Sequence, residues 1–472
     1  MILPSYRALR SAPVGHQLLG ALLLGLVLVA LMRVRRQRGR DVHHRGARIE
    51  TASRSRRRLR RVPGLGTLRP ISLATVAIAP LEETKHFKLI GTTGTGKSTA
   101  IAELIGGALG RGDRAVIADP DGGYLEHFHA PGRGDVILNP FERRAPRWDP
   151  FAELDGPADP QQLAASLIAP GEDASGREWR GYARTFLASV LRRAHERGGD
   201  VRQLWHLIAV APGTELRPLL EDTPAQPFLE PENARMFGSI RSVATACCAA
   251  LEHVCAQCAR DFSVRRWVRG GRGVLFLPYR AGEIAALRTL IASWMRLAIF
   301  ETMDGPPADR RLWFVIDELD ALGAIDGLRD ALARLRKFGG RCVLGFQSIG
   351  QVAALYGMGD AQTLVENCGN TLILRCSASE RGGTAQFCSR LIGEREIARR
   401  TVARTREGLG GFGGGPRAAR RSVHLSEQRV TELAVLPSEI EQLADLEGFL
   451  KTAGSPCWLK VRVRAQALSR TG

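Results

Sequence analysis

The sequence predicts an α/β fold in which short apolar strands form a largely parallel sheet with helices between them. Three observations predict it. A glycine-rich loop stands between a strand-like run at 86–90 and a helix-prone stretch, Thr99–Leu109. A five-residue apolar run, Leu312–Ile316, ends in two carboxylates, and a third apolar strand is expected at Arg341–Phe346. Uninterrupted apolar runs of this length are typical of parallel strands that are buried on both faces.

Other apolar runs complete the expected sheet, at Ala115–Ala118, Gly273–Pro278 and Thr371–Leu374. A chain of 472 residues is long enough to hold more than one hydrophobic core.

The nine cysteines do not indicate a secreted disulfide framework in a chain of this length. Cys255 and Cys258 have C-x-x-C spacing, but no second pair completes a set of four zinc ligands, so packing on a helix face is the favoured interpretation.

The N-terminal region predicts a membrane anchor. Val14–Met32 contains 19 residues without a formal charge, roughly 28 Å of helix, which is enough to cross a bilayer core. Arginines follow from Arg33 where a signal peptide would have a small-residue cleavage site, so an uncleaved anchor is expected, with the later residues in the cytoplasm. Residues 33–62 carry 13 arginines against two acidic residues and are expected to form a basic linker beside anionic lipid headgroups, with nucleic acid as the alternative contact.

The glycine-rich loop Gly91–Ser98 matches the pattern G-x-x-x-x-G-K-[ST] between a strand and a helix, the context that this motif requires. Its backbone N–H groups and the following helix N-terminus favour phosphate binding. Lys97 is expected to reach the β- and γ-phosphates of ATP, and Ser98 to ligate Mg²⁺. The residues expected to contact the nucleotide are Gly91, Thr92, Thr93, Gly94, Thr95, Gly96, Lys97, Ser98 and Thr99.

Asp317 and Glu318 follow the apolar run at the edge of the sheet where ligands bind in open α/β folds. Asp317 is expected to hold the hydration shell of the Mg²⁺ that Ser98 ligates, and Glu318 to orient or deprotonate an attacking water. Capping of the next helix would explain one of the two acids but less readily both. Gln347, which ends the third strand, is expected to sense the γ-phosphate, and an ordinary strand-end glutamine is the alternative.

With these residues placed, the chain resembles the type IV coupling proteins of the TraD/TrwB kind, the DNA-pumping ATPases of bacterial conjugation. The resemblance runs from about Ile71 to Arg464 and lies in the order and spacing of short segments. These segments are His86-Phe, Asp119-Pro-Asp-Gly, Ile137-Leu-Asn-Pro140, Trp148-Asp-Pro-Phe, Trp179–Arg184, Phe262–Trp267, Arg311–Leu319, Arg336–Gly339, Gln347-Ser and Leu436–Ile440.

The resemblance implies a RecA-like domain interrupted by an all-α domain, in a hexameric ring with ATP at the subunit interfaces. It implies single-stranded DNA in the central channel, bound without sequence specificity, and as partners the relaxase or relaxosome and inner-membrane components of the secretion system. The location implied is the bacterial inner (cytoplasmic) membrane, with the motor in the cytoplasm.

Family members usually carry two membrane helices, whereas this sequence shows one convincing span. The expected divisions are an anchor at 1–32, a linker at 33–62, a nucleotide-binding domain at 63–151 and 262–472, and an all-α domain at 152–261.

A ring ATPase of this type needs an arginine from a neighbouring subunit, and Arg336 and Arg375 are the candidates. A solvated or ion-paired surface position is the alternative for each of them. The glycine-rich segment Gly408–Arg421 favours a disordered surface hairpin over a mobile DNA contact with Phe412 as a stacking group.

Two other functions compete with DNA translocation. One is an ATPase that unfolds or exports proteins, and the other is a non-enzymatic membrane platform that ATP holds together. Glu318 and Gln347 favour the two hydrolytic functions, because a platform would not need a general base.

Overall fold

The computed structural model describes residues 42–51, 70–169, 171, 174–306, 309–379, 382–406 and 421–464. The predicted span at Val14–Met32, most of the basic linker 33–62, and residues 408–420 of the glycine-rich segment lie outside these described residues. Within the described ranges, no helix is both long and apolar enough to cross a membrane.

The chain divides into two compact units. The smaller comprises Met1–Arg48 and Ile392–Ala434, and the larger comprises Ile49–Leu391 and Val435–Gly472. Each unit is built on a sheet of its own.

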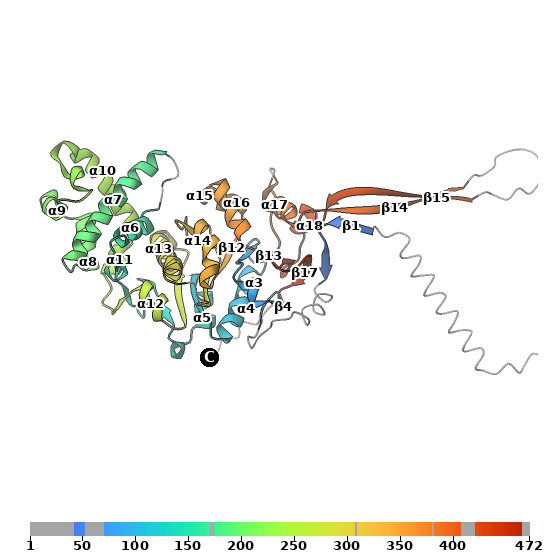
Figure 1. The fold of residues 1–472 in the computed structure, drawn as a ribbon, viewed down its shortest axis with the longest axis horizontal. Helices are drawn as coiled ribbons and strands as arrows, with labels where there is room; N and C mark the ends of the chain where they lie inside the picture. Colours follow the sequence, from blue (N-terminus) through green and yellow to red (C-terminus); the bar gives the residue numbers. More distant parts are fainter. Residues whose placement is uncertain are drawn as a thin grey trace, which may run out of the picture. The chain divides into compact units, whose positions relative to one another are not determined.

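The larger unit is built on a ten-stranded mixed sheet with the order β2-β17-β16-β13-β5-β12-β11-β6-β10-β7 (Figure 1). In that order the strands span Ile49–Thr51, Trp458–Arg462, Glu447–Lys451, Asn370–Ile373, Phe87–Ile90, Gly340–Phe346, Leu312–Ile316, Arg114–Pro120, Val274–Tyr279 and Val136–Ile137. Every neighbouring pair from β13 to β7 is parallel, whereas β16 is antiparallel to both of its neighbours. The apolar runs predicted as strands therefore form the parallel centre of this sheet.

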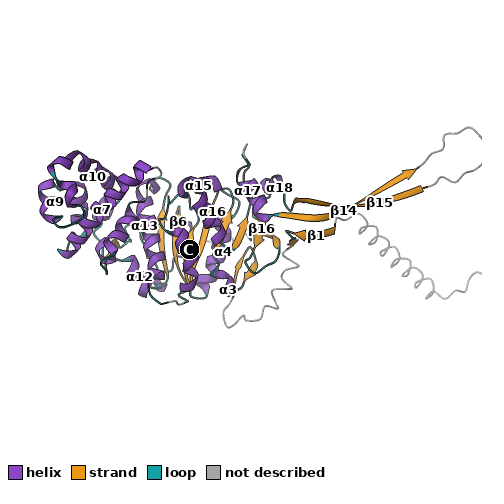
Figure 2. Ribbon diagram, turned by 45° about the horizontal axis from the view of Figure 1, so that its top comes forward, coloured by secondary structure: helices purple, strands orange, loops and turns teal. Residues whose placement is uncertain are grey.

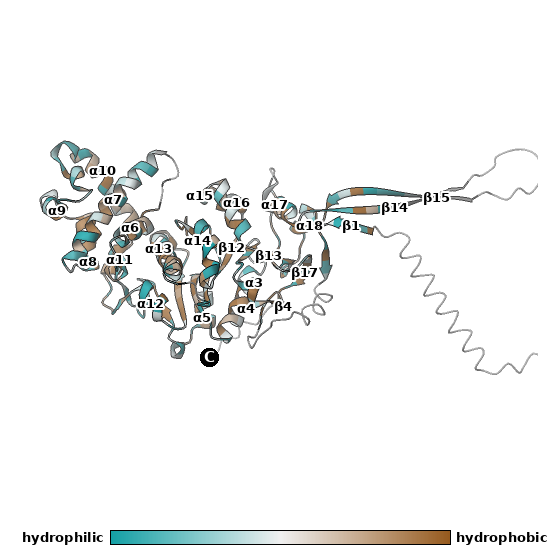
Figure 3. Ribbon diagram, viewed as in Figure 1, coloured by the Kyte–Doolittle hydropathy of each residue, from teal (hydrophilic) through white to brown (hydrophobic). Residues whose placement is uncertain are grey.

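Helices cover both faces of the parallel strands, which explains why most residues of these strands are apolar. All residues of β5, β11, β12 and β13 are buried, and Figure 3 shows the central strands mostly in the colour of hydrophobic residues. On one face, Phe87 and Leu89 pack in one hydrophobic cluster with the helix α4, Lys97–Gly110. On the other face, Lys88 donates hydrogen bonds to the carbonyl oxygens of Val365 and Cys368 at the end of α16.

The remaining helices and a small β-hairpin surround this sheet (Figure 2). They are β3 (Ile71–Leu73), β4 (Val76–Ile78), α3 (Pro80–Glu83), α5 (Gly123–Phe128), α12 (Val264–Gly270), α13 (Ile284–Met303), α14 (Leu328–Leu335), α15 (Ile349–Tyr356), α16 (Met358–Asn367), α17 (Gly383–Ile392) and α18 (Pro437–Glu441).

An all-helical region interrupts the sheet between β7 and β10, as the sequence predicts. The chain enters this region through β8 (Arg147–Trp148) and leaves it through β9 (Asp261–Phe262), and the two short strands pair in parallel. Its helices are α6 (Asp159–Leu167), α7 (Ala174–Glu196), α8 (Val201–Ala209), α9 (Gly213–Leu219), α10 (Ala234–Cys248) and α11 (Leu251–Cys255). The Cys255 thiol donates to the Val201 carbonyl oxygen at 3.3 Å, so this cysteine contributes to the packing of α11 on α8.

The smaller unit is a three-stranded antiparallel sheet with the order β1-β14-β15. Strands β14 (Glu394–Arg406) and β15 (Arg421–Leu433) pair along their whole length, from Glu394 opposite Leu433 to Arg406 opposite Arg421. Strand β1 (Val42–Gly46) pairs with the first residues of β14. The sequence prediction of a loop at 408–421 did not include these two long strands, which flank it.

Candidate functional site

The loop from Gly91 to Ser98 connects β5 to α4 and has a backbone shape that glycine makes accessible. Gly94 and Gly96 have φ angles of 78° and 103°, in the left-handed region where glycine is favoured. At Gly96 a Cβ atom would also lie 2.5 Å from a methyl carbon of Leu446, so a larger residue would require this side chain to shift in addition to adopting an unfavourable φ angle. A Cβ atom added at Gly94 would have no other atom within 4 Å, so open space adjoins the loop at this residue.

The loop is fastened to the neighbouring strand end. The Thr92 backbone N–H donates to the carbonyl oxygen of Arg375 at 2.9 Å, and the Thr92 hydroxyl donates to the same oxygen at 3.2 Å. The buried Thr95 hydroxyl donates to the Thr92 carbonyl oxygen at 2.7 Å. Thr92 and Thr95, which the sequence predicts as nucleotide contacts, therefore have a second role in holding the shape of the loop.

Lys97, Ser98 and Asp317 meet at the carboxyl end of the parallel strands. The Ser98 hydroxyl donates to Oδ2 of Asp317 at 2.5 Å, and the Lys97 ammonium group lies 3.7 Å from Oδ1 of the same carboxylate. Lys97 and Asp317 are both nearly inaccessible, with side chains 6% and 2% exposed. The structure thus brings together three residues that the sequence predicts as phosphate and magnesium contacts.

The Asp317 carboxylate fits the demands of a magnesium ion. Its Oδ1 atom is buried and has no hydrogen-bond partner among the described residues, which is costly for a carboxylate oxygen. Mg²⁺ prefers carboxylate, hydroxyl and water oxygens, and it retains several water molecules in proteins. The open Oδ1 atom and the adjacent Ser98 hydroxyl are oxygen ligands of this type, so the residues present fit the ion.

Glu318 follows Asp317 directly, and Gln347 connects Glu318 to Thr93 in the glycine-rich loop. The Gln347 side-chain amide donates to Oε1 of Glu318 at 3.4 Å, and the Gln347 side-chain oxygen accepts a hydrogen bond from the Thr93 hydroxyl at 3.0 Å. Burial, followed by the negative charge of Asp317, raises the pKa of Glu318, and the charge of Lys97 opposes this. A carboxylate with a raised pKa is a better proton acceptor, which suits a general base.

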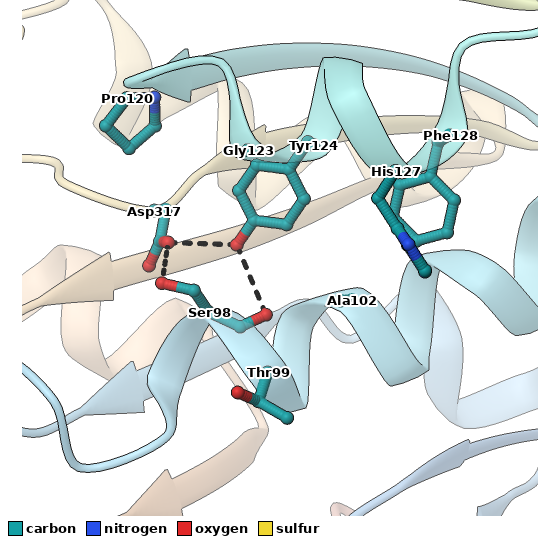
Figure 4. Close-up of a pocket in the computed structure, with 9 residues that line it drawn as sticks. All are labelled: Ser98, Thr99, Ala102, Pro120, Gly123, Tyr124, His127, Phe128 and Asp317. Carbon is teal, nitrogen blue, oxygen red and sulfur yellow. Dashed lines mark hydrogen bonds between the residues drawn. The ribbon is translucent and has the colours of Figure 1, made fainter. Parts of the chain in front are cut away.

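Two residues of the site have no role in the sequence prediction. The Tyr124 hydroxyl donates to Oδ2 of Asp317 at 2.9 Å, and Figure 4 shows it facing both Asp317 and Ser98. Asp119 is fully buried and accepts hydrogen bonds from the backbone N–H groups of Tyr124 at 3.0 Å and Leu125 at 2.7 Å. Burial raises the pKa of Asp119 to about 7, although these two hydrogen bonds lower it.

The sequence does contain a signal for Asp119, because this residue follows the apolar run Ala115–Ala118 in the same way that Asp317 follows Leu312–Ile316. The parallel register of β11 with β6 pairs Ile316 with Ala118, so the residues that follow, Asp317 and Asp119, lie on adjacent strands. Tyr124 lies in the six-residue helix α5, too short for any apolar period to show which way its side chain points.

A cavity of about 260 Å³ adjoins this carboxylate group (Figure 4). It lies between the first turns of α4 and the helix α5, and Thr99 is one of its lining residues. Its other lining residues are Ser98, Ala102, Pro120, Gly123, Tyr124, His127, Phe128 and Asp317.

The two candidate arginines lie in different places. Arg336 is exposed in a short 3-10 helix at the amino end of β12, whereas Gln347 follows the carboxyl end of that strand, so Arg336 does not join the site of its own chain. Arg375 follows β13 next to the loop, and its guanidinium group forms an ion pair with Asp445 at 2.7 Å. A role for either arginine in a neighbouring subunit stays a prediction.

Comparisons with known proteins identify the family of this chain. The family model of the type IV secretion-system coupling protein DNA-binding domain matches residues 70–464. The coupling protein TraD of Escherichia coli K12 is 29% identical over 407 residues, which cover 84% of this chain and 55% of TraD. The coupling protein VirD4 of Bartonella quintana is 32% identical over 115 residues, 24% of this chain and 17% of that protein. This chain therefore spans about half the length of TraD and a smaller share of VirD4.

Solved structures of the conjugative coupling protein TrwB have the same fold. The unbound form of TrwBdeltaN70 superimposes with a TM-score of 0.78 at 30% identity and covers 91% of this chain and 95% of that one. TrwB in complex with ADP and Mg²⁺ superimposes with a TM-score of 0.79 at 30% identity and covers 92% of this chain and 97% of that one. Since the family model matches most of the sequence, this chain belongs to the family of type IV secretion-system coupling proteins.

Proposed function

We propose that the chain hydrolyses ATP with Mg²⁺ to move single-stranded DNA towards a type IV secretion channel during conjugation. The observation that carries the ATPase part is the Asp317 carboxylate, with Oδ2 occupied by the Ser98 hydroxyl and a buried Oδ1 open. Glu318 stands next to it and is linked to the nucleotide loop through Gln347. The TrwB complexes with ADP and Mg²⁺ and with the ATP analogue ADPNP support the same nucleotide and ion for this chain.

Each residue has a distinct task in this mechanism. Lys97 places its positive charge where the phosphate oxygens bind, and Ser98 and Asp317 supply oxygen atoms for the ion. Mg²⁺, when bound, neutralises negative charge on the phosphates. Glu318 orients the attacking water and accepts its proton at Oε. Gln347 contacts both the Thr93 hydroxyl and Glu318, and these contacts support a role in reporting the state of the loop to the base.

The DNA, ring and membrane parts of the proposal rest on the family and the charge of the chain. The matching family model describes a DNA-binding domain, and the chain carries a net charge of +19. We propose a homohexamer with non-sequence-specific single-stranded DNA in its channel, and with the relaxosome and inner-membrane secretion components as partners. The uncharged segment Val14–Met32 would anchor it in the bacterial inner membrane, with the motor in the cytoplasm.

The test is ATP hydrolysis by the full chain in detergent, measured against protein concentration without DNA, with single-stranded DNA and with duplex DNA. The Lys97→Ala variant removes the phosphate contact, and Lys460→Ala is a matched control because Lys460 is 53% exposed. We expect hydrolysis that rises steeply with protein concentration, responds to single strands, survives in Lys460→Ala and is lost in Lys97→Ala.

Two outcomes would contradict the proposal in different ways. Hydrolysis that is indifferent to DNA would favour an ATPase that exports or unfolds proteins. ATP binding without hydrolysis, in a preparation shown to form rings, would favour a non-enzymatic platform.

A further inference from the structure

The Asp317 carboxylate receives a second hydroxyl donor, from Tyr124, which lies outside the glycine-rich loop Gly91–Ser98. Oδ2 of Asp317 accepts hydrogen bonds from Ser98 at 2.5 Å and from Tyr124 at 2.9 Å. The Tyr124 side chain is 5% exposed, and its hydroxyl also lies 3.5 Å from the Ser98 carbonyl oxygen. The phenol therefore bridges Asp317, which follows β11, and Ser98 in the first turn of α4, as Figure 4 shows.

The backbone that carries Tyr124 is held firmly in place. Asp119 accepts the N–H groups of Tyr124 and Leu125, and so fixes the start of α5 to the end of β6. The turn between them has positive φ angles at Asp121 and Gly122, 56° and 73°. The Asp121 N–H donates to the carbonyl oxygen of Tyr279 on the next strand at 2.8 Å. The position of the phenol is therefore set by the sheet edge and not by a surface loop.

The two donors decide which oxygen of Asp317 is available to a metal ion. A single hydrogen bond from Ser98 would leave the carboxylate free to turn about its terminal bond, and it could then present either oxygen. With a second donor on Oδ2, the carboxylate is fixed with Oδ1 open on the side of Lys97. Groups that orient a metal ligand in this way commonly change metal affinity by about 10- to 100-fold when they are removed.

We propose that Tyr124 is a positioning residue that sets the affinity of the site for the magnesium–nucleotide complex by fixing the Asp317 carboxylate. The proposal rests on the ATPase function proposed above. The Tyr124 hydroxyl donates to Asp317, the expected metal ligand, so we expect it to act on ion binding rather than on proton transfer. Loss of the hydroxyl should weaken Mg²⁺ binding and leave the maximal rate near that of the parent chain.

The test uses the full chain and the variant Tyr124→Phe, which keeps the buried ring and removes only the hydroxyl. Binding of a fluorescent, non-hydrolysable ATP analogue is titrated with MgCl₂. We expect the Mg²⁺ concentration for half-maximal binding to rise about tenfold, with unchanged affinity for the analogue in EDTA. ATP hydrolysis at saturating Mg²⁺ should keep its kcat. The control is Tyr182→Phe, which loses an exposed hydroxyl that donates to Glu178 in the all-α region.

The double variant separates positioning from a general loss of structure. If Tyr124 acts through Asp317, then Tyr124→Phe should cause no further shift in the Mg²⁺ midpoint when Asp317→Asn is already present. An unchanged midpoint in the single variant, or a fall in kcat that Mg²⁺ does not restore, would overturn the proposal. Failure of the parent chain to bind the analogue at all would instead overturn the proposed ATPase function, and thermal melting curves identify a variant that does not fold.

Discussion

At the residue scale, the Glu318 carboxylate lies beside Asp317 and contacts the amide of Gln347. The change Glu318→Gln keeps the size of the side chain but removes its ability to accept a proton. We expect turnover to fall by about 10²- to 10⁴-fold while ATP binding is retained. Single-turnover hydrolysis together with analogue binding measures both quantities.

The control for this change is Glu221→Gln, at an exposed position in the all-α region. It should hydrolyse ATP at the parent rate. If Glu318→Gln did so as well, another group would have to accept the proton.

The buried imidazole of His86 is expected to make the free energy of unfolding depend on pH. This residue is buried, and its Nδ1 atom accepts the Cys342 backbone N–H at 3.1 Å while Nε2 lies 2.9 Å from the Leu332 carbonyl oxygen. Burial, which desolvates the charged ring, lowers the pKa of His86 from 6.5 to about 4; the hydrogen bond with Leu332 opposes this, and the charges of Arg341 and Arg336 add to it. The unfolded chain therefore binds a proton first as pH falls, and the folded state loses up to about 3 kcal/mol between pH 6.5 and 4.

The measurement is the Tm at pH 7.5 and at pH 5. We expect the drop in Tm between these values to be smaller in His86→Gln, which cannot titrate, than in the parent chain. His206→Gln, which changes an exposed histidine paired with Glu215, should retain the full drop. Equal drops in the parent chain and His86→Gln would show that other groups cause the pH dependence.

At the element scale, Glu153 joins the chain that enters the all-α region to the helix α12 that follows this region. Its buried carboxylate accepts four hydrogen bonds. They come from Trp148 Nε1 at 3.0 Å, Ser263 Oγ at 3.0 Å, and the backbone N–H groups of Val264 at 2.7 Å and Arg265 at 3.0 Å. Because the last three donors begin α12, this single side chain fixes that helix to the chain that enters the all-α region.

Removal of this carboxylate should be strongly destabilising. In Glu153→Ala four buried donors lose their partner, and we expect the free energy of unfolding to fall by about 2–4 kcal/mol. Denaturant unfolding followed by tryptophan fluorescence measures the change. Glu142→Ala, which removes a half-buried carboxylate paired with the exposed Arg144, should cost less than about 1 kcal/mol. A similar cost for both changes would mean that Glu153 does not hold the junction.

The elements also differ in how far the sequence predicts them. Strands such as Leu312–Ile316 are recognisable because burial on both faces makes every residue apolar. Strand β1, Val-His-His-Arg-Gly, has no such pattern, and four of its five residues are exposed. Strands β14 and β15 carry many arginines, and their pairing is not encoded in any local period. Tyr124 was missed for a related reason, because its contact with Asp317 spans 193 residues of sequence.

At the scale of the whole molecule, the two strands nearest the predicted anchor belong to different sheets. Strand β1 pairs with β14 in the smaller unit, and β2 pairs with β17 at one end of the ten-stranded sheet. Only Ala47 and Arg48 separate the two strands. A soluble version of the chain that begins near Val62, after the basic linker, therefore lacks both.

Without β1 and β2, the strands β14 and β17 would each present a row of unpaired N–H and C=O groups to solvent. Such rows act as templates for strands of other molecules and promote aggregation. We expect a version starting at Val62 to form larger, irregular particles in light scattering than one starting at Arg33, which retains both strands. Equal particle sizes would show that the edges are protected in another way. If residues 42–51 protect these two strand edges, they also set where a soluble form of this chain can begin without exposing a surface for self-association.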